Sequence, residues 1–306
     1  MTDPLAFLPL ALAAANGAID GFESRRLVAA GVALLQRTGP LVRTLHGHRA
    51  ALLLPACPQF LVALAASDGR AALLLDPNDQ NDPNDAIAHE LERARVAAVF
   101  TTRALAGRLP EKMPRVLLDE APSRATWRHG TDARDIDLTL HEGLRLEGEI
   151  DAEGAPEEVI VLHHRSTEGN VPERALTHRE LLSAARAAAQ SARLGRRDHT
   201  LTLLPFSSRL GLVEGLVAPL IAGGRLSTAP AADPGEIATR LEQDGVSVLV
   251  AGADSYVAIV QHLALHGRTL DAPVLQRCIV DDASIDASLQ ARWHALTGVE
   301  ITRGDG

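Results

Sequence analysis

The sequence predicts an α/β protein built on parallel β-sheets, and three observations support this fold class. Short apolar runs alternate with segments of helical periodicity from about residue 49 to the end of the chain. Most of the runs are apolar throughout, as strands covered on both faces should be. Several helical segments also begin with residues that cap helices.

The apolar runs are five to seven residues long, which favours strands over helices. In chain order, they predict strands at residues 49–55, 71–75, 96–102, 115–119, 159–163, 200–204, 225–229, 246–251 and 277–281. The segments between them predict helices at residues 58–67, 85–95, 178–193, 211–222, 234–244, 254–266 and 285–296, with a further helical run at 23–36 near the start.

Capping residues support three of these helices. Asn84 or Asp85 can cap the helix expected at residues 85–95, and Thr177 can cap the helix that begins at residue 178. Pro234 follows Asp233 at a first-turn position, where its missing N–H costs nothing. By contrast, residues 121–156 are polar and weakly periodic, so we expect a surface excursion between better packed units.

Composition limits the function classes. The chain has 306 residues, 46% hydrophobic and 23% charged, which suits one large or two modest globular domains. A net charge of −9 without a visible basic patch argues against nucleic acid and anionic lipid as partners. The apolar opening at residues 5–15 is too short to span a bilayer and lacks the cationic start of a signal peptide, so we expect a cytoplasmic protein.

Cysteine and lysine are scarce. Cys57 and Cys278 lie far apart without metal-ligand spacing, so we expect two buried thiols in a reducing compartment. Lys112 is the only lysine. His163 and His164 would point to opposite faces of a strand, and like His178 they have no Cys or carboxylate group at ligand spacing. We therefore predict no metal site.

Two stretches carry a family likeness. Residues 51–102 resemble the early part of the adenylate-forming ligases, the superfamily of AMP-dependent synthetases that includes acyl-CoA and acyl-carrier-protein synthetases. Residues 159–306 are similar to the same family through a phosphate loop, a substrate-pocket segment and an adenine-site segment. The resemblance covers about two thirds of the chain and depends on the order and spacing of motifs, none of which is intact.

The phosphate loop of that family reads roughly Ser-Gly-Thr-Thr-Gly-x-Pro-Lys-Gly and precedes a Leu-Thr-His that opens a helix. The matching residues here are Arg165, Ser166, Thr167, Glu168, Gly169, Asn170, Val171, Pro172, Glu173 and Arg174, and then Ala175, Leu176, Thr177 and His178. Such a loop binds phosphate through backbone N–H groups, hydroxyls and a lysine. Here the lysine is absent, and two carboxylates stand where phosphates would bind.

The size of this effect can be estimated. Two unit charges about 4 Å apart interact by about 4 kcal/mol at an effective dielectric constant near 20, enough to offset one cationic contact. We therefore expect ATP binding to be weak. The guanidinium groups of Arg165 and Arg174 are the available compensation.

The other motifs are altered too. Residues 204–212 resemble a Pro-x-Phe-His-x-x-Gly stretch, with Ser208 at the histidine position and Gly211 at the glycine. Ser208 can hydrogen-bond a carboxylate but cannot titrate near neutral pH. The resemblance also implies a pocket beside Gly252 and Tyr256. Asp281, Asp282 and Ala283 replace a Gly-Gly-Ala-Pro element near the adenine, and Asp305 replaces a tyrosine that stacks on it.

The resemblance implies two parallel-sheet lobes in α/β/α/β/α layers, as in the N-terminal domain of acyl-CoA synthetases, without the C-terminal domain that brings a second catalytic lysine. We expect a first lobe over residues 1–195 and a second over 196–306, with residues 1–45 packing on the second.

Two functions follow from these expectations. In the first, the chain is a degenerate and non-catalytic homologue with no catalytic residue and no cofactor. It is then an oligomeric binding or scaffolding partner for an acyl or aryl acid, a carrier protein or a pathway enzyme. In the second, it remains an ATP- and Mg²⁺-dependent ligase that activates carboxylic acids and is completed by another chain.

Overall fold

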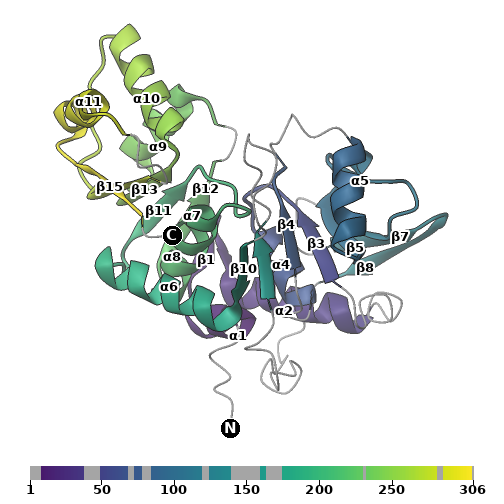
Figure 1. Ribbon diagram of the computed structural model, residues 1–306. Coiled ribbons are helices and arrows are strands. Elements are labelled where there is room, and N and C mark those ends of the chain that lie inside the picture. Colours follow the sequence, from purple (N-terminus) through teal and green to yellow (C-terminus); the bar gives the residue numbers. More distant parts are fainter. Residues whose placement is uncertain are drawn as a thin grey trace. The chain divides into compact units, whose positions relative to one another are not determined.

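The structure, a computed structural model, describes residues 8–37, 49–67, 72–77, 84–118, 124–138, 159–162, 174–229, 232–280 and 285–304. The chain divides into two compact units (Figure 1). The first comprises residues 1–14 and 22–182, and the second comprises residues 15–21 and 183–306. Each unit has its own β-sheet.

The sheet of the first unit contains the strands β3 (Arg49–Leu53), β4 (Ala72–Leu75), β5 (Val96–Thr102), β6 (Arg115–Leu118), β7 (Arg124–His129), β8 (Asp132–Asp137), β9 (Val159–Leu162) and β10 (Arg174–Thr177). Their order is β10-β9-β4-β3-β5-β6-β7-β8. The strands from β9 to β6 are parallel, and antiparallel strands flank them on both sides. The parallel part accounts for the fully apolar runs in the sequence.

Helices cover both faces of these parallel strands. The helices of this unit are α1 (Leu8–Ala14), α2 (Ser24–Arg37), α4 (Gln59–Ala66), α5 (Asn84–Arg93) and the 3-10 turn η2 (Ala106–Arg108). Helix α5 packs Ile87 and Leu91 on one face of β3, β4 and β5. Residues that alternate to the other face, such as Leu74 and Phe100, are also fully buried. Helices α2 and α4 pack closely at Gly31, where a Cβ would collide with the carbonyl oxygen of Val62.

The sheet of the second unit contains β1 (Ala18–Ile19), β11 (His199–Thr202), β12 (Arg225–Thr228), β13 (Val248–Ala251), β14 (Arg277–Val280) and β15 (Ile301–Arg303). The short β2 (Phe22–Glu23), where the chain passes into the first unit, follows β1 at the edge. Their order is β15-β14-β13-β11-β12-β1-β2. All strands from β15 to β1 are parallel, so their carboxyl ends lie along one edge.

The second unit is also layered. Its helices are most of α6 (His178–Ser191), then α7 (Arg209–Leu212), the π-helical turn η5 (Val213–Val217), α8 (Ala218–Ile221), α9 (Pro234–Gln243), α10 (Ala253–Leu265) and α11 (Ala287–Thr297). Helices α9, α10 and α11 bury their apolar faces on one side of the sheet, around Tyr256 and Trp293. Leu210 of α7 packs on the other side, against Val248, Val250 and Ile279.

These features confirm the predicted fold class, a mixed α/β protein with two mostly parallel sheets. Each predicted strand and helix is present, with ends shifted by a few residues. Asp233 caps α9 by accepting hydrogen bonds from Gly235 N (2.8 Å) and Glu236 N (3.0 Å), with Pro234 at the first helical position. The side chains of Asn84 and Asp85 lie outside the described residues.

Two expectations were wrong in part. Residues 124–137, expected in a surface excursion, form the antiparallel β7–β8 hairpin, because Ala125, Trp127 and Ile136 supply a one-sided apolar face. The helix expected at 211–222 begins at Arg209 and contains the π-helical turn. The strands β1, β2, β10 and β15, too short or too polar to be recognised, were not predicted.

Candidate functional site

The segment that resembles a phosphate loop connects β9 to β10. Residues 163–173, which include Arg165, Ser166, Thr167, Glu168 and Gly169, lie outside the described residues. Their anchors are described: β9 and β10 pair antiparallel, with Leu162 opposite Arg174. Since β9 runs parallel to β4, the loop leaves from the carboxyl end of the parallel strands. Arg174 begins β10, and its side chain is not described.

A capping box fixes the exit from this hairpin into α6. Thr177 Oγ1 accepts a hydrogen bond from Glu180 N (3.1 Å), while Glu180 Oε2 accepts one from Thr177 N (2.9 Å). This reciprocal pair satisfies two backbone donors of the first turn. The predicted cap at Thr177 is therefore confirmed. The next residue, His178, is fully buried.

Lys112 lies at the opposite end of the same sheet. It occupies an exposed turn just before β6, and β6 runs parallel to β5, β3, β4 and β9. A residue that precedes a parallel strand is at the amino edge, whereas the β9–β10 loop leaves from the carboxyl edge. The only lysine of the chain thus lies at the opposite edge of the sheet from Leu162 and Arg174, the anchors of this loop.

In the second unit, the segment that resembles a substrate pocket follows β11. Ser208 is the N-cap of α7: its Oγ accepts a hydrogen bond from Gly211 N (3.0 Å) and donates one to Pro205 O (2.9 Å). The backbone N of Ser208 also donates to Pro205 O. The hydroxyl therefore closes a local turn, a task for which serine is well suited.

Two glycines allow close packing here, Gly211 within the pocket-like segment and Gly304 between that segment and the C-terminal one. A Cβ on Gly211 would collide with Pro205 O and lie 2.7 Å from Ser208 Oγ. A Cβ on Gly304 would collide with Leu210 Cδ1 and lie 2.6 Å from Glu214 Oε1. Gly304 therefore packs directly on the helical segment that begins at Ser208, and its N–H donates to Val280 O (2.9 Å).

The π-helical turn was missed by sequence reasoning. It places Glu214, only 6% exposed, beside Gly304, and it brings Gly215 against Thr202 of β11. Turns of this kind often occur at functional sites. A carboxylate inside the apolar run at 211–222 was the only signal in the sequence. Periodicity could not reveal the extra residue in the turn.

Gly252 and Tyr256 follow β13. Gly252 is the N-cap of α10 in an extended conformation and, as a glycine, brings no side chain to cap the first turn. Tyr256 is fully buried: its hydroxyl lies 3.0 Å from Ile279 O and 3.2 Å from Leu249 O, and its ring packs edge-on against Trp293 at 4.9 Å. The tyrosine thus ties α10 to β13 and β14 from within the core.

The residues compared with the adenine site lie beyond the ends of the outer strands. Asp281, Asp282 and Ala283 follow β14, and Asp305 follows β15, all of them outside the described residues. The described residues before them, Val280 and Arg303, are in register on parallel strands. The pocket-like, Gly252 and adenine-like segments therefore all leave from the same edge of the second sheet, where ligands bind in open α/β sheets.

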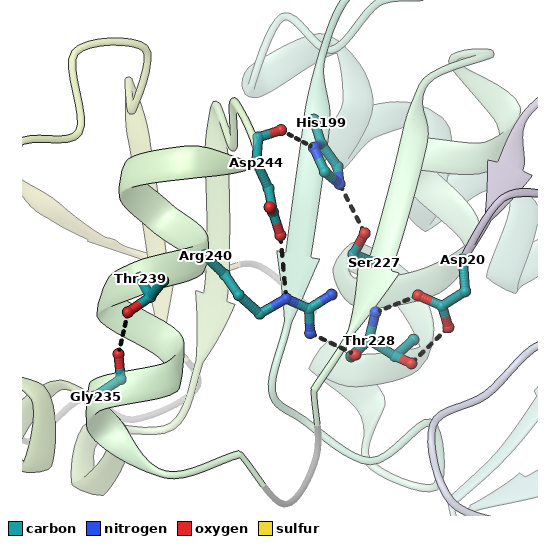
Figure 2. Close-up of polar contacts among 8 residues, drawn as sticks. All are labelled: Asp20, His199, Ser227, Thr228, Gly235, Thr239, Arg240 and Asp244. Atoms are coloured by element: carbon teal, nitrogen blue, oxygen red, sulfur yellow. Dashed lines mark hydrogen bonds and ion pairs between the residues drawn. The ribbon is translucent and has the colours of Figure 1, made fainter.

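A polar network connects β11, β12 and the end of α9 in the second unit (Figure 2). His199 lies 2.8 Å from Ser227 Oγ through Nε2 and 3.0 Å from Asp244 O through Nδ1. Arg240 Nε contacts Asp244 Oδ2 (3.2 Å) and its Nη1 donates to Thr228 O (3.1 Å). Burial lowers the pKa of His199, and the positive charges of Arg225 and Arg240 also act to lower it. The imidazole is therefore kept neutral and structural.

Asp20 extends this network to the edge of the sheet. Its two carboxylate oxygens accept hydrogen bonds from Thr228 N (2.9 Å) and Thr228 Oγ1 (2.7 Å), as Figure 2 shows. The contact fixes the turn after β1 at the carboxyl end of β12.

The described residues hold no cluster of three or more His, Cys, Asp or Glu side chains placed to bind a metal. Within the same residues, no helix combines the length and the apolar character needed to cross a membrane.

The chain is similar to several proteins of known description. It is 24% identical over 218 residues to a dimodular nonribosomal peptide synthase of Bacillus subtilis, a match that covers 69% of this chain and 8% of that protein. Its structure resembles apo MatB from Rhodopseudomonas palustris (TM-score 0.70, 19% identity, 97% of this chain and 59% of MatB). It also resembles the anthranilate CoA ligase AuaEII in complex with anthranoyl-AMP (TM-score 0.71, 14% identity, 97% and 58%).

These likenesses define the class of protein. The two structural neighbours show a shared fold with this chain, which spans less than two thirds of the length of any of the three proteins. The family model described as AMP-binding enzyme matches residues 44–304. The chain therefore belongs to the AMP-binding, adenylate-forming family.

Proposed function

We propose that this chain is a non-catalytic member of the AMP-binding family that binds an acyl or aryl acid, or a carrier protein, beside a pathway that uses them. One observation carries the proposal: the only lysine, Lys112, is exposed at the amino edge of the first sheet, whereas Leu162 and Arg174, which flank the loop that would need a phosphate-binding cation, lie at the carboxyl edge. A phosphate loop without an ammonium group loses its main electrostatic partner.

The loop sequence also supports the proposal. Glu168 and Glu173 add negative charge where the family resemblance places the phosphates of ATP. Adenylation needs the developing charge on pyrophosphate to be neutralised, and each lost electrostatic stabiliser typically costs a factor of about 100 to 1,000 in rate. Two carboxylates and a missing lysine together would leave little activity.

The carboxyl edge of the second sheet keeps features that suit the binding of an acid. They are the packing of Gly211 and Gly304 and an uncapped helix N-terminus at Gly252. Helix N-termini attract carboxylates. Ser208 uses its hydroxyl within its own turn, so the acid would be held by backbone groups and apolar side chains instead of a titrating imidazole.

A second candidate is an ATP-dependent ligase that activates carboxylic acids. It is favoured by Arg174, which begins β10 at the end of the loop, because guanidinium is a good phosphate partner. A separate polypeptide would then supply a catalytic lysine and the rest of the active site.

Pyrophosphate exchange with a panel of fatty, aromatic and amino acids separates the two candidates. We expect no exchange above the background without protein. Exchange that depends on one acid and is lost in Arg174→Ala would establish the ligase instead.

Two variants of Gly252 test whether an acid binds at this edge. Their affinity for the same acids is measured by calorimetry in the absence of ATP. Gly252→Asp places a carboxylate at the N-cap of α10, where Asp stabilises the helix but repels a bound acid. Gly252→Ser provides a cap without the charge. We expect acid binding in the wild type and in Gly252→Ser, and at least tenfold weaker binding in Gly252→Asp. Equal affinity in both variants would contradict a site at this edge.

A further inference from the structure

Two histidines lie one turn apart at the end of α10, on the second unit. His262 is half-buried in the last turn of the helix and His266 is exposed at its C-cap. Their ring centroids are 4.3 Å apart, with an angle of 34° between the ring planes. A spacing of four residues places both side chains on the same face of a helix.

A backbone hydrogen bond defines the tautomer of His266. Its Nδ1 lies 2.8 Å from the carbonyl oxygen of His262. A carbonyl oxygen can only accept, so Nδ1 carries the hydrogen and Nε2 of the neutral ring carries a free lone pair. Histidines that bind metals are oriented in this way, with the other ring nitrogen donating to a carbonyl or a carboxylate.

The distance between the rings suits a shared metal ion. With metal–nitrogen bonds of about 2.0–2.1 Å, two imidazoles bound at 90° have centroids about 4.5 Å apart, and at a tetrahedral angle about 5.2 Å. The observed 4.3 Å is close to the first value. The bond from Nδ1 to the carbonyl holds the His266 ring, so its Nε2 is the donor on that side. A small rotation of the His262 ring alone would direct one of its nitrogens toward the same point.

The surroundings favour a cation at this place. On the inner side, the Cε1–Nε2 edge of His262 lies against α9, where a Cβ on Gly235 would come within 2.8 Å of Cε1. Since Nε2 lies on this packed edge, Nδ1 is the nitrogen of His262 that can face an ion shared with His266. The end of α10 also presents the negative end of the helix dipole, which stabilises positive charge.

We propose that His262 and His266 form a surface site for a divalent transition-metal ion. Imidazole nitrogens bind Cu²⁺, Ni²⁺ and Zn²⁺, and a 90° chelate suits the tetragonal geometry of Cu²⁺ and Ni²⁺ more than tetrahedral Zn²⁺. Water would complete the coordination. Of the three ions, Cu²⁺ should bind most tightly, since it has the highest affinity in the divalent series.

Two measurements test the site. Titration of the full chain with NiCl₂ at pH 7.5 in a calorimeter gives the affinity. The electron paramagnetic resonance spectrum with one added equivalent of Cu²⁺ gives the number of nitrogens coupled to the metal. Other histidines of the chain can also bind metal, so the test compares variants. His262→Asn and His266→Asn each remove one donor, and His294→Asn removes an exposed histidine on α11 as the matched control.

We expect either variant of the pair to weaken the tightest Ni²⁺ binding step at least tenfold and to reduce the number of nitrogens coupled to Cu²⁺. His294→Asn should change neither. His266 is exposed, so its variant should fold, which circular dichroism can check. Wild-type affinity and spectra in the double variant His262→Asn/His266→Asn would overturn the proposal.

Discussion

Replacing Ser208 by alanine should destabilise the second unit without involving any ligand. The substitution removes the hydrogen bond to Gly211 N (3.0 Å) and leaves that donor without its cap in a buried turn. Loss of an N-cap typically costs about 1 kcal/mol, and a buried unsatisfied donor costs about 1–3 kcal/mol. These terms describe the same N–H group and do not add, so we expect a loss of about 1–2 kcal/mol. For a unit of this size, that corresponds to about 4–6 °C in Tm.

Each unit contains one of the two tryptophans, Trp127 in the first and Trp293 in the second. In a Trp127→Phe background, urea and thermal unfolding followed by fluorescence would report on the second unit alone. Ser208→Asp keeps a capping oxygen and should restore most of the stability. Ser288→Ala changes an exposed serine on α11 and should have little effect. Wild-type stability of Ser208→Ala would refute the structural role of this hydroxyl.

Three further outcomes are expected. Burial raises the pKa of Cys278 to about 12. Ellman's reagent at pH 8 should therefore modify the half-buried Cys57 in the native state, and Cys278 only once the chain is unfolded. Equal rates for both thiols in the native state would contradict the structure. The lowered pKa of His199 means that the unfolded chain binds this proton more tightly. Stability should therefore be full above the unfolded pKa of about 6.5 and fall as pH drops below it. His199→Gln should reduce this pH dependence of the urea midpoint, and an unchanged dependence would exclude His199 as its source. Gly304→Ala should cost about 1–3 kcal/mol in urea unfolding through overpacking. Leu210→Ala should recover part of that loss, because Leu210 Cδ1 occupies the space of the new methyl; no recovery would place the strain elsewhere.

Much of the fold could be predicted because its main signals are local. Strands such as β5 are runs of apolar residues buried on both faces, and α9 begins with an Asp-Pro pair whose geometry matches the expected cap. The β7–β8 hairpin could not be predicted in the same way. Its strands carry many exposed charged side chains, and its buried apolar residues are few: Ala125, Trp127 and Ile136, beside the buried polar Thr126.

Less of the candidate site could be predicted. The motif order indicated which segments meet at the strand ends, and Gly304 does pack on the segment after Ser208. The role of Ser208 as a cap depends on the carbonyl of Pro205 and the N–H of Gly211, a local geometry that a comparison of motifs does not reveal. The π-helical turn and the burial of Glu214 have no periodic signature, and the pairing of His262 with His266 depends on where α10 ends.

We propose that the charge of the loop between β9 and β10 prevents ATP binding. The most direct test is to titrate ATP with magnesium into the wild type and into Glu168→Thr/Glu173→Lys. The double variant restores a hydroxyl and an ammonium group at the positions that match the family loop. We expect the wild type to show no binding up to millimolar ATP and the double variant to bind measurably. Micromolar binding by the wild type, lost when Thr167 and Gly169 are replaced, would contradict the proposal that this chain has lost its nucleotide chemistry.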